Sequence, residues 1–296
     1  MIDKRVTLAE AAALVGDGDV VALQSMATQL APMALVRELI RQQKRDLALV
    51  VLVGGIAVDW LAAAGSLSRL IGAAVSMEQF GLCQQYRRAV ETGRIRVEEL
   101  SESMLNARLG AGARGLPFLP TRGGIGSDLV AQNPDNLRLI DDPFGGRPVL
   151  ACRALLADVA LLHAHRADAQ GNVACEPTAR WPDLAIMPKA ARKVIVSVEE
   201  IVPTERLRQQ PERTVLPGFA VDAVVEVPYG AHPTSLFPSY GYDAAMHRRW
   251  AKAARDDEQT QAFLERQVLA PANQGEYLEA AGGEAMLARI RAWEEA

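Results

Sequence analysis

The most constraining feature of this sequence is a regular alternation of short β-like runs with segments of helical periodicity. A short apolar run at residues 19–23 leads into residues 32–40, where the apolar side chains recur at helical spacing. Residues 47–53 then form a continuous apolar run, which is typical of a strand buried on both faces. This alternation predicts an α/β fold with an open, largely parallel sheet flanked by helices.

The same pattern continues along the chain. Further strands are predicted at residues 69–75, 158–164, 193–198 and 221–227, with a turn at 168–172. A helix is predicted over residues 80–91, and another begins at Ser101, a good N-cap. The Gly- and Pro-rich residues 117–128 are predicted to form a loop. Because no low-complexity linker divides the chain, we expect one domain over residues 1–296, mostly helical from about residue 243.

Composition excludes several classes of function. The 296 residues are 49% hydrophobic, enough to bury a full core, and the net charge of −4 comes without a Lys/Arg cluster. We therefore expect no nucleic acid and no membrane surface as a partner. The apolar run at 47–58 is far shorter than the ~20 residues of a membrane-spanning helix. A charged start at residues 1–5 and three widely spaced cysteines, Cys83, Cys152 and Cys175, predict a cytoplasmic protein.

Two features between residues 101 and 128 have both a functional and a structural explanation. Gly123, Gly124 and Gly126 would let backbone N–H groups approach a phosphate or an oxyanion, but a tight loop explains them equally well. They lack the GxGxxG spacing, and no Walker lysine follows. Glu102 complements the positive end of a helix dipole. As a catalytic base it would need burial against a substrate pocket, which raises a carboxyl pKa.

The histidines and the remaining glutamates are also ambiguous. His163 and His165 share one face of a predicted strand, but no third ligand lies at a typical spacing, so we expect no metal site. His232 follows the last predicted strand and could face a cleft or make a structural hydrogen bond. Glu199 and Glu200 follow another strand, where charges ordinarily return the chain to water. No GxSxG elbow or Cys/His signature of a self-contained hydrolase is present.

Several segments, in order, resemble the A subunits of class I CoA-transferases such as glutaconate CoA-transferase. They are residues 31–36, 115–128, 140–144, 158–164, 217–225 and 228–233. The resemblance implies a B subunit of similar fold, an active site at the interface, and assembly into a heterotetramer or a larger complex. It also implies coenzyme A as a substrate, with no permanently bound cofactor.

The resemblance further implies a division of labour. In these transferases a B-subunit glutamate attacks the acyl-CoA, and this chain lacks the Ser-Glu-Asn-Gly setting of that nucleophile. The A subunit shapes the acyl pocket, here through residues 24–28 and Glu102. Transferases have a glycine pair in place of Gln24–Ser25 and a hydrogen-bond-donating glutamine in place of Glu102, whose ionised carboxylate only accepts. The substrate site would comprise Gln24, Ser25, Ser76, Arg122, Gly124 and His232, with Glu102 as the catalytic residue.

Three functions are compatible with this pattern. The family default is transfer of CoA between an acyl-CoA and a small carboxylic acid. The second is ring-opening or decarboxylating chemistry on a CoA ester with Glu102 as base, because a glutamate at this place resembles the steroid ring-opening hydrolases of the same family. The third is a non-catalytic acyl-CoA-binding or regulatory protein, which the loss of the glycine pair would permit.

Overall fold

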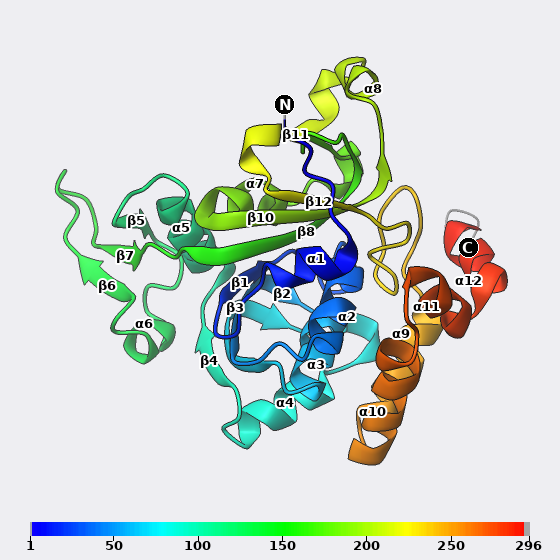
Figure 1. Ribbon diagram of the computed structural model, residues 1–296. Coiled ribbons are helices and arrows are strands. Elements are labelled where there is room, and N and C mark those ends of the chain that lie inside the picture. Colours follow the sequence, from blue (N-terminus) through cyan, green and yellow to red (C-terminus); the bar gives the residue numbers. More distant parts are fainter. Residues whose placement is uncertain (1, 293–296) are drawn as a thin grey trace.

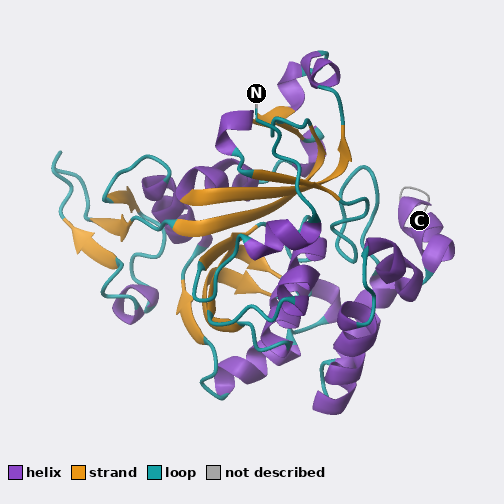
Figure 2. Ribbon diagram, viewed as in Figure 1, coloured by secondary structure: helices purple, strands orange, loops and turns teal. Residues whose placement is uncertain are grey.

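The computed structural model describes residues 2–292, with the backbone alone at Pro182, and consists of a large sheet between helices (Figures 1 and 2). Seven parallel strands run in the order β4 (Arg96–Glu99), β3 (Leu67–Val75), β2 (Leu47–Gly54), β1 (Val20–Leu23), β8 (Ala157–Ala167), β10 (Ala191–Ile201) and β12 (Ala223–Glu226). The short strands β9 (Val173–Ala174) and β11 (Thr214–Leu216) extend the sheet antiparallel from the end of β8. The predicted α/β fold is confirmed.

The direction of winding reverses between β1 and β8. From β1 the chain proceeds to β4 through α2 (Met33–Arg41), α3 (Ile56–Ala63) and α4 (Gln84–Glu91). From β8 it proceeds the other way to β12, through α7 (Pro182–Ile186) and η3 (Met187–Ala190). Because crossovers between parallel strands are right-handed, the two sets of helices cover opposite faces. Such a reversal opens a crevice at the carboxyl ends of the strands, where ligands bind in open α/β sheets.

Local signals account for the starts of the helices. Ser101 caps α5 (Glu102–Gly112) by accepting a hydrogen bond from the Met104 backbone N–H, as its sequence predicts. Thr7 and Glu10 form a capping box at α1 (Leu8–Ala13). The remaining short helices are η1 (Glu78–Phe80), α6 (Leu129–Gln132), η2 (Pro177–Ala179), α8 (Thr204–Arg208), η4 (Pro211–Arg213) and η5 (Gly218–Ala220).

Two predictions about local structure need correction. Residues 118–121, expected in a loop, form the strand β5 (Phe118–Thr121), which pairs antiparallel with β7 (Val149–Arg153); β6 (Leu137–Ile140) lies on the other side of β7. Pro120 is tolerated because β5 is an edge strand. The helix expected over 80–91 begins only at Gln84.

The C-terminal helices gather at the end of the molecule opposite β5–β7 (Figure 1). They are α9 (Ala244–Ala253), α10 (Asp257–Leu264), the π-helical turn η6 (Glu265–Leu269), α11 (Gln274–Ala281) and α12 (Gly283–Arg291). None of the helices within residues 2–292 is both long and apolar enough to cross a bilayer.

An aromatic cluster and a buried carboxylate attach these helices to α3. The Trp60 and Trp250 ring centroids are 6.0 Å apart, and Phe263 packs edge-on against both rings. Asp59 accepts hydrogen bonds from Trp250 Nε1 at 2.8 Å and from the Tyr86 backbone N–H at 2.7 Å. Burial nevertheless raises the pKa of Asp59 to about 6. One carboxyl therefore links α3, α4 and α9.

Replacing Trp250 with Phe should destabilise the chain more than replacing Trp60 with Phe. Both indoles are fully buried, but only Trp250 donates to a carboxylate, whereas Trp60 Nε1 has no partner among residues 2–292. We expect the free energy of unfolding of the Trp250→Phe variant to be about 1–3 kcal/mol lower than that of the Trp60→Phe variant. Urea denaturation of both variants measures this difference. Equal losses would show that the Asp59 contact adds no stability.

Candidate active site

Gln24 and Ser25 directly follow β1 at the reversal of winding. Gln24 Oε1 accepts a hydrogen bond from the His163 backbone N–H on β8 at 2.7 Å. The Ser25 backbone N–H donates to Asp183 Oδ2 at 3.2 Å. Gln24 Nε2 and Ser25 Oγ are fully buried and have no partner in the described part of the chain. Buried polar atoms are normally hydrogen-bonded, so a water or a ligand oxygen would satisfy these two donors.

The loop after Ser25 has a tightly fixed backbone. Ala27 and Leu30 adopt φ values of +52° and +62°, which are rare for residues with a Cβ atom. The Ala27 N–H donates to the Val53 carbonyl at 3.0 Å, and the Leu30 N–H donates to the Ser235 carbonyl at 2.8 Å. A Cβ on Gly55 would lie 2.2 Å from the Ala27 carbonyl oxygen, so only glycine fits beneath this loop. Local strain held in place by its surroundings is typical of functional sites.

Glu102, the predicted catalytic residue, is the first residue of α5 and is exposed. Asp183 lies in the first turn of α7, which packs against α5, and is almost fully buried. Burial, and to a smaller extent the charge of Glu102, raises the pKa of Asp183 to about 6. Asp183 also accepts a hydrogen bond from the Ser25 backbone N–H, so one buried carboxyl contacts the end of β1 and senses the charge of Glu102.

The glycine-rich loop packs against the start of α5. A Cβ on Gly123 would lie 1.9 Å from Ser103 Oγ, and a Cβ on Gly124 would lie 1.9 Å from Met104 Cε. Gly124 also has a φ of +87°, which favours glycine. The loop therefore approaches the residues that follow Glu102 more closely than any side chain would permit. Arg122, immediately before it, is exposed.

Ser76 lies at the carboxyl end of β3, near the same edge of the sheet. Its backbone N–H donates to the Gly54 carbonyl, and its Oγ accepts from the Glu78 N–H, both at 2.9 Å. Glu78 in turn accepts a hydrogen bond from Thr28 Oγ1 at 3.2 Å. This contact joins the loop after β3 to the loop after β1.

The side chain of His232 contacts the C-terminal helices. It is fully buried, with Nδ1 2.8 Å from the Tyr277 hydroxyl and Nε2 3.2 Å from Asp243. Asp243 caps α9 and Tyr277 belongs to α11, so His232 connects the C-terminal helices to the main body. Of the two interpretations of His232, the structure favours the structural hydrogen bond over contact with substrate.

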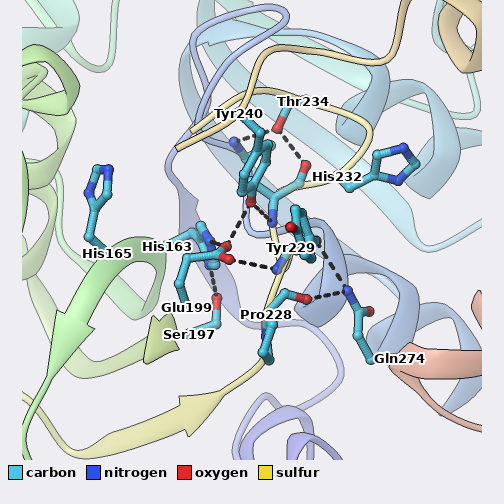
Figure 3. A network of polar contacts seen from close by, with 12 residues as sticks. His163, His165, Ser197, Glu199, Pro228, Tyr229, His232, Thr234, Tyr240 and Gln274 are labelled. Atoms are coloured by element: carbon cyan, nitrogen blue, oxygen red, sulfur yellow. Dashed lines mark hydrogen bonds and ion pairs between the residues drawn. The ribbon is translucent and has the colours of Figure 1, made fainter. Parts of the chain in front are cut away.

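Glu199 lies inside β10 and is not a charge that returns the chain to water (Figure 3). Its carboxylate accepts hydrogen bonds from His163 Nε2 at 2.8 Å, the Tyr240 hydroxyl at 2.7 Å and the Tyr229 N–H at 2.7 Å. Although burial acts in the opposite direction, these donors lower the pKa of Glu199. His163 Nδ1 lies 2.8 Å from Ser197 Oγ. The network fixes the segment around Tyr229 against the end of β8.

Sequence patterns did not reveal Asp183 or the partners of Glu199. Asp183 has one local signal, since it follows Pro182 at the start of a helix, but nothing in the sequence relates it to Ser25, 158 residues away.

His165, close to His163 on β8, contacts the Phe237 carbonyl through Nε2 at 3.0 Å. Among residues 2–292, no three His, Cys, Asp or Glu side chains are placed to bind a metal ion.

A doubly wound sheet with polar groups at its reversal of winding defines the class of α/β enzymes that bind substrates at the carboxyl edge. The sequence model of the coenzyme A transferase family matches residues 5–227. The chain therefore belongs to the coenzyme A transferase family.

Known relatives of this chain catalyse different reactions. It is 34% identical to the cholesterol ring-cleaving hydrolase IpdA subunit of Rhodococcus jostii, over 88% of this chain and 90% of the relative. The crystal structure of glutaconate coenzyme A-transferase from Acidaminococcus fermentans matches with a TM-score of 0.91 and 30% identity, covering 97% of this chain and 95% of the other. The crystal structure of a variant of the decarboxylase AibA/AibB matches with a TM-score of 0.77 and 36% identity, covering 90% and 100%. The chain also spans 66% of an uncharacterized protein from Archaeoglobus fulgidus, at 34% identity over its own full length.

The raised pKa of Asp183 predicts a pH-dependent effect of Asp183→Asn on stability. A carboxyl whose pKa rises on folding stabilises the fold below the unfolded pKa, near 3.8, and this stabilisation is lost as the pH rises through about 6. An asparagine at this position cannot ionise, so relative to wild type the variant should gain roughly 2–3 kcal/mol in free energy of unfolding between pH 4 and pH 7.5. Urea denaturation at both pH values measures this change. A pH-independent difference would contradict the assignment.

Proposed function

We propose that this chain is the A subunit of a heteromeric CoA-transferase that moves CoA between an acyl-CoA and a small carboxylic acid. The observation that carries the proposal is the match to glutaconate coenzyme A-transferase over 97% of the chain. A B subunit would complete the site and supply the nucleophilic glutamate, because this chain holds no counterpart of that residue. We expect a heterotetramer or larger assembly in the cytoplasm, where the three unpaired cysteines are stable.

In this mechanism the B-subunit carboxylate attacks the thioester carbonyl and CoA thiolate leaves, giving a mixed anhydride. The thiolate then attacks the glutamyl carbonyl of that anhydride, which releases the first acid and forms a glutamyl-CoA thioester. The second carboxylic acid takes over the CoA by the reverse of these steps. Negative charge develops on the carbonyl oxygen at each attack. The unpartnered Gln24 Nε2 and Ser25 Oγ are suitable donors to that oxygen.

A second function, hydrolysis or decarboxylation of a CoA ester, is favoured by the carboxylate of Glu102. An ionised carboxylate cannot donate to a thioester oxygen, but it can remove a proton from a water or from the substrate. Glu102 is the first residue of α5 and is exposed, so a water or a substrate can reach its carboxylate. The hydrolase and decarboxylase relatives share 34% and 36% identity with this chain.

Mass spectrometry of the co-expressed subunits separates the two functions. The enzyme is incubated with a panel of acyl-CoA esters, with and without acetate, and both protein adducts and small products are recorded. A CoA adduct on the B subunit together with exchange onto acetate supports transfer. A ring-opened or decarboxylated product without an adduct contradicts transfer and supports the second function. A chain that binds acyl-CoA and converts none of the panel contradicts both.

Glu102→Gln distinguishes the roles of this residue. If Glu102 is a base, we expect turnover to fall about 10²-fold or more, because glutamine cannot accept the proton. If the enzyme is a transferase, most activity should survive, since transferases carry glutamine at this place. Initial rates with the best substrate of the panel give the answer. Glu99→Gln is the matched control, because Glu99 is also exposed and lies three residues earlier on β4.

A further inference from the structure

Three cations of α9 and the turn after it line a groove that has no part in the site described above. Arg248, Lys252 and Arg255 follow one another at intervals of four and three residues, so they lie on one face of the helix. Gln79, Phe80 and Ala251 complete the lining, and the groove has a volume of about 430 Å³. Ligand sites in proteins commonly have volumes of roughly 300–1,000 Å³.

The positive charge of the groove has no acidic partner in the part of the chain that the structure describes. Within residues 2–292, none of the three cations belongs to an ion pair. The nearest acidic residues in sequence have other roles, since Asp256 caps α10 and Asp257 pairs with Arg88. The chain as a whole carries a net charge of −4, so this cluster is a local feature. Clustered, unpaired cations beside a cavity favour a ligand with several negative charges.

Phe80 provides an aromatic wall next to these charges. Its ring stacks on His247 with the centroids 4.9 Å apart, and the Arg248 guanidinium carbon lies 6.0 Å from its centroid. The ring is only partly buried, which leaves surface for a flat ligand group. An aromatic face beside several cations suits a nucleotide, whose base stacks while its phosphates bind the guanidinium and ammonium groups.

The groove is connected to the candidate active site through η1. Ser76 directly follows β3, and Gln79 and Phe80 follow within four residues. Glu78, between them, accepts the hydrogen bond from Thr28 in the loop after β1. Gln79 Nε2 also donates to the Tyr242 hydroxyl, immediately before α9. A long substrate with its reacting group near Ser25 can therefore extend along this edge of the sheet toward α9.

We propose that this groove binds the 3′-phospho-ADP end of acyl-CoA, with the phosphates on Arg248, Lys252 and Arg255 and the adenine against Phe80. The inference rests on the proposed function, because an acyl-CoA carries its thioester and its nucleotide at opposite ends of a flexible pantetheine arm. It assigns part of CoA recognition to the A subunit. The same groove would accept a free adenine nucleotide, so the test includes one without a 3′-phosphate.

The first measurement compares two substrates that share one acyl group. In the co-expressed enzyme, Arg248, Lys252 and Arg255 are changed together to Gln, and kcat/KM is measured for the acyl-CoA and for the matching acyl-pantetheine, which lacks the nucleotide. The ratio of the two values should fall by about tenfold or more, and the fall should shrink as salt is added. Arg266→Gln is the control, because Arg266 is an exposed cation of η6, in the same group of C-terminal helices, and does not line the groove. An unchanged ratio in the triple variant overturns the proposal.

The second measurement does not depend on turnover. Isothermal titration gives the affinity of the wild-type and triple-variant enzymes for 3′-phospho-ADP and for ADP. Tighter binding of 3′-phospho-ADP by the wild type, weakened about tenfold in the variant, supports the site even if the panel of esters is not converted. Equal affinity of both enzymes for 3′-phospho-ADP overturns it. Equal affinity of the wild type for both nucleotides overturns the assignment to CoA, leaving a general nucleotide site.

Discussion

The pairing of β1 with β8 is the constraint on which the rest of the fold depends. These strands lie at the centre of the sheet and mark the reversal of its winding. β1 ends at Leu23, whereas β8 continues to Ala167, so the backbone of β8 needs another partner beyond the end of β1. The Gln24 side chain supplies one by accepting the His163 N–H. The Gln24 side chain thus replaces the backbone of a longer β1 as the hydrogen-bond partner of β8. The candidate site lies where β1 would otherwise continue.

Two classes of buried carboxyl hold the surrounding elements, and they differ in how fully their charge is compensated. Asp59 and Asp183 are held mainly by backbone N–H groups, and burial dominates, so their pKa values are raised. Glu199 and Asp243 each have a histidine partner and further donors, and these lower the pKa despite burial. Asp59 and Asp183 therefore take up a proton at mildly acidic pH, whereas Glu199 and Asp243 remain ionised. The charge state at each position follows from the partners, not from depth alone.

The sequence predicts local structure well and long-range contacts poorly. Helical spacing, apolar runs and the Ser101 cap depend on neighbouring residues, and they place the central strands and the start of α5 correctly. β5 was not predicted, because a strand that contains Pro120 is acceptable only at the edge of a sheet. Which strands lie at an edge depends on tertiary structure. His232 occupies a turn, as expected, but Asp243 and Tyr277 bury it. Glu199 differs from an ordinary strand-end charge only through its contacts with His163, Tyr229 and Tyr240.

The contact between Asp59 and Trp250 joins residues 191 positions apart, which bears on synthesis as well as on stability. On the ribosome, the strands and helices of the first half emerge long before α9 and α10. Until then Asp59 has no indole donor, and Trp60 lacks the rings of Trp250 and Phe263 that cover it in the finished protein. Exposed apolar surface of this kind is where incomplete chains associate with one another and with chaperones. The core around α3 is therefore completed only after α9 and α10 have left the ribosome.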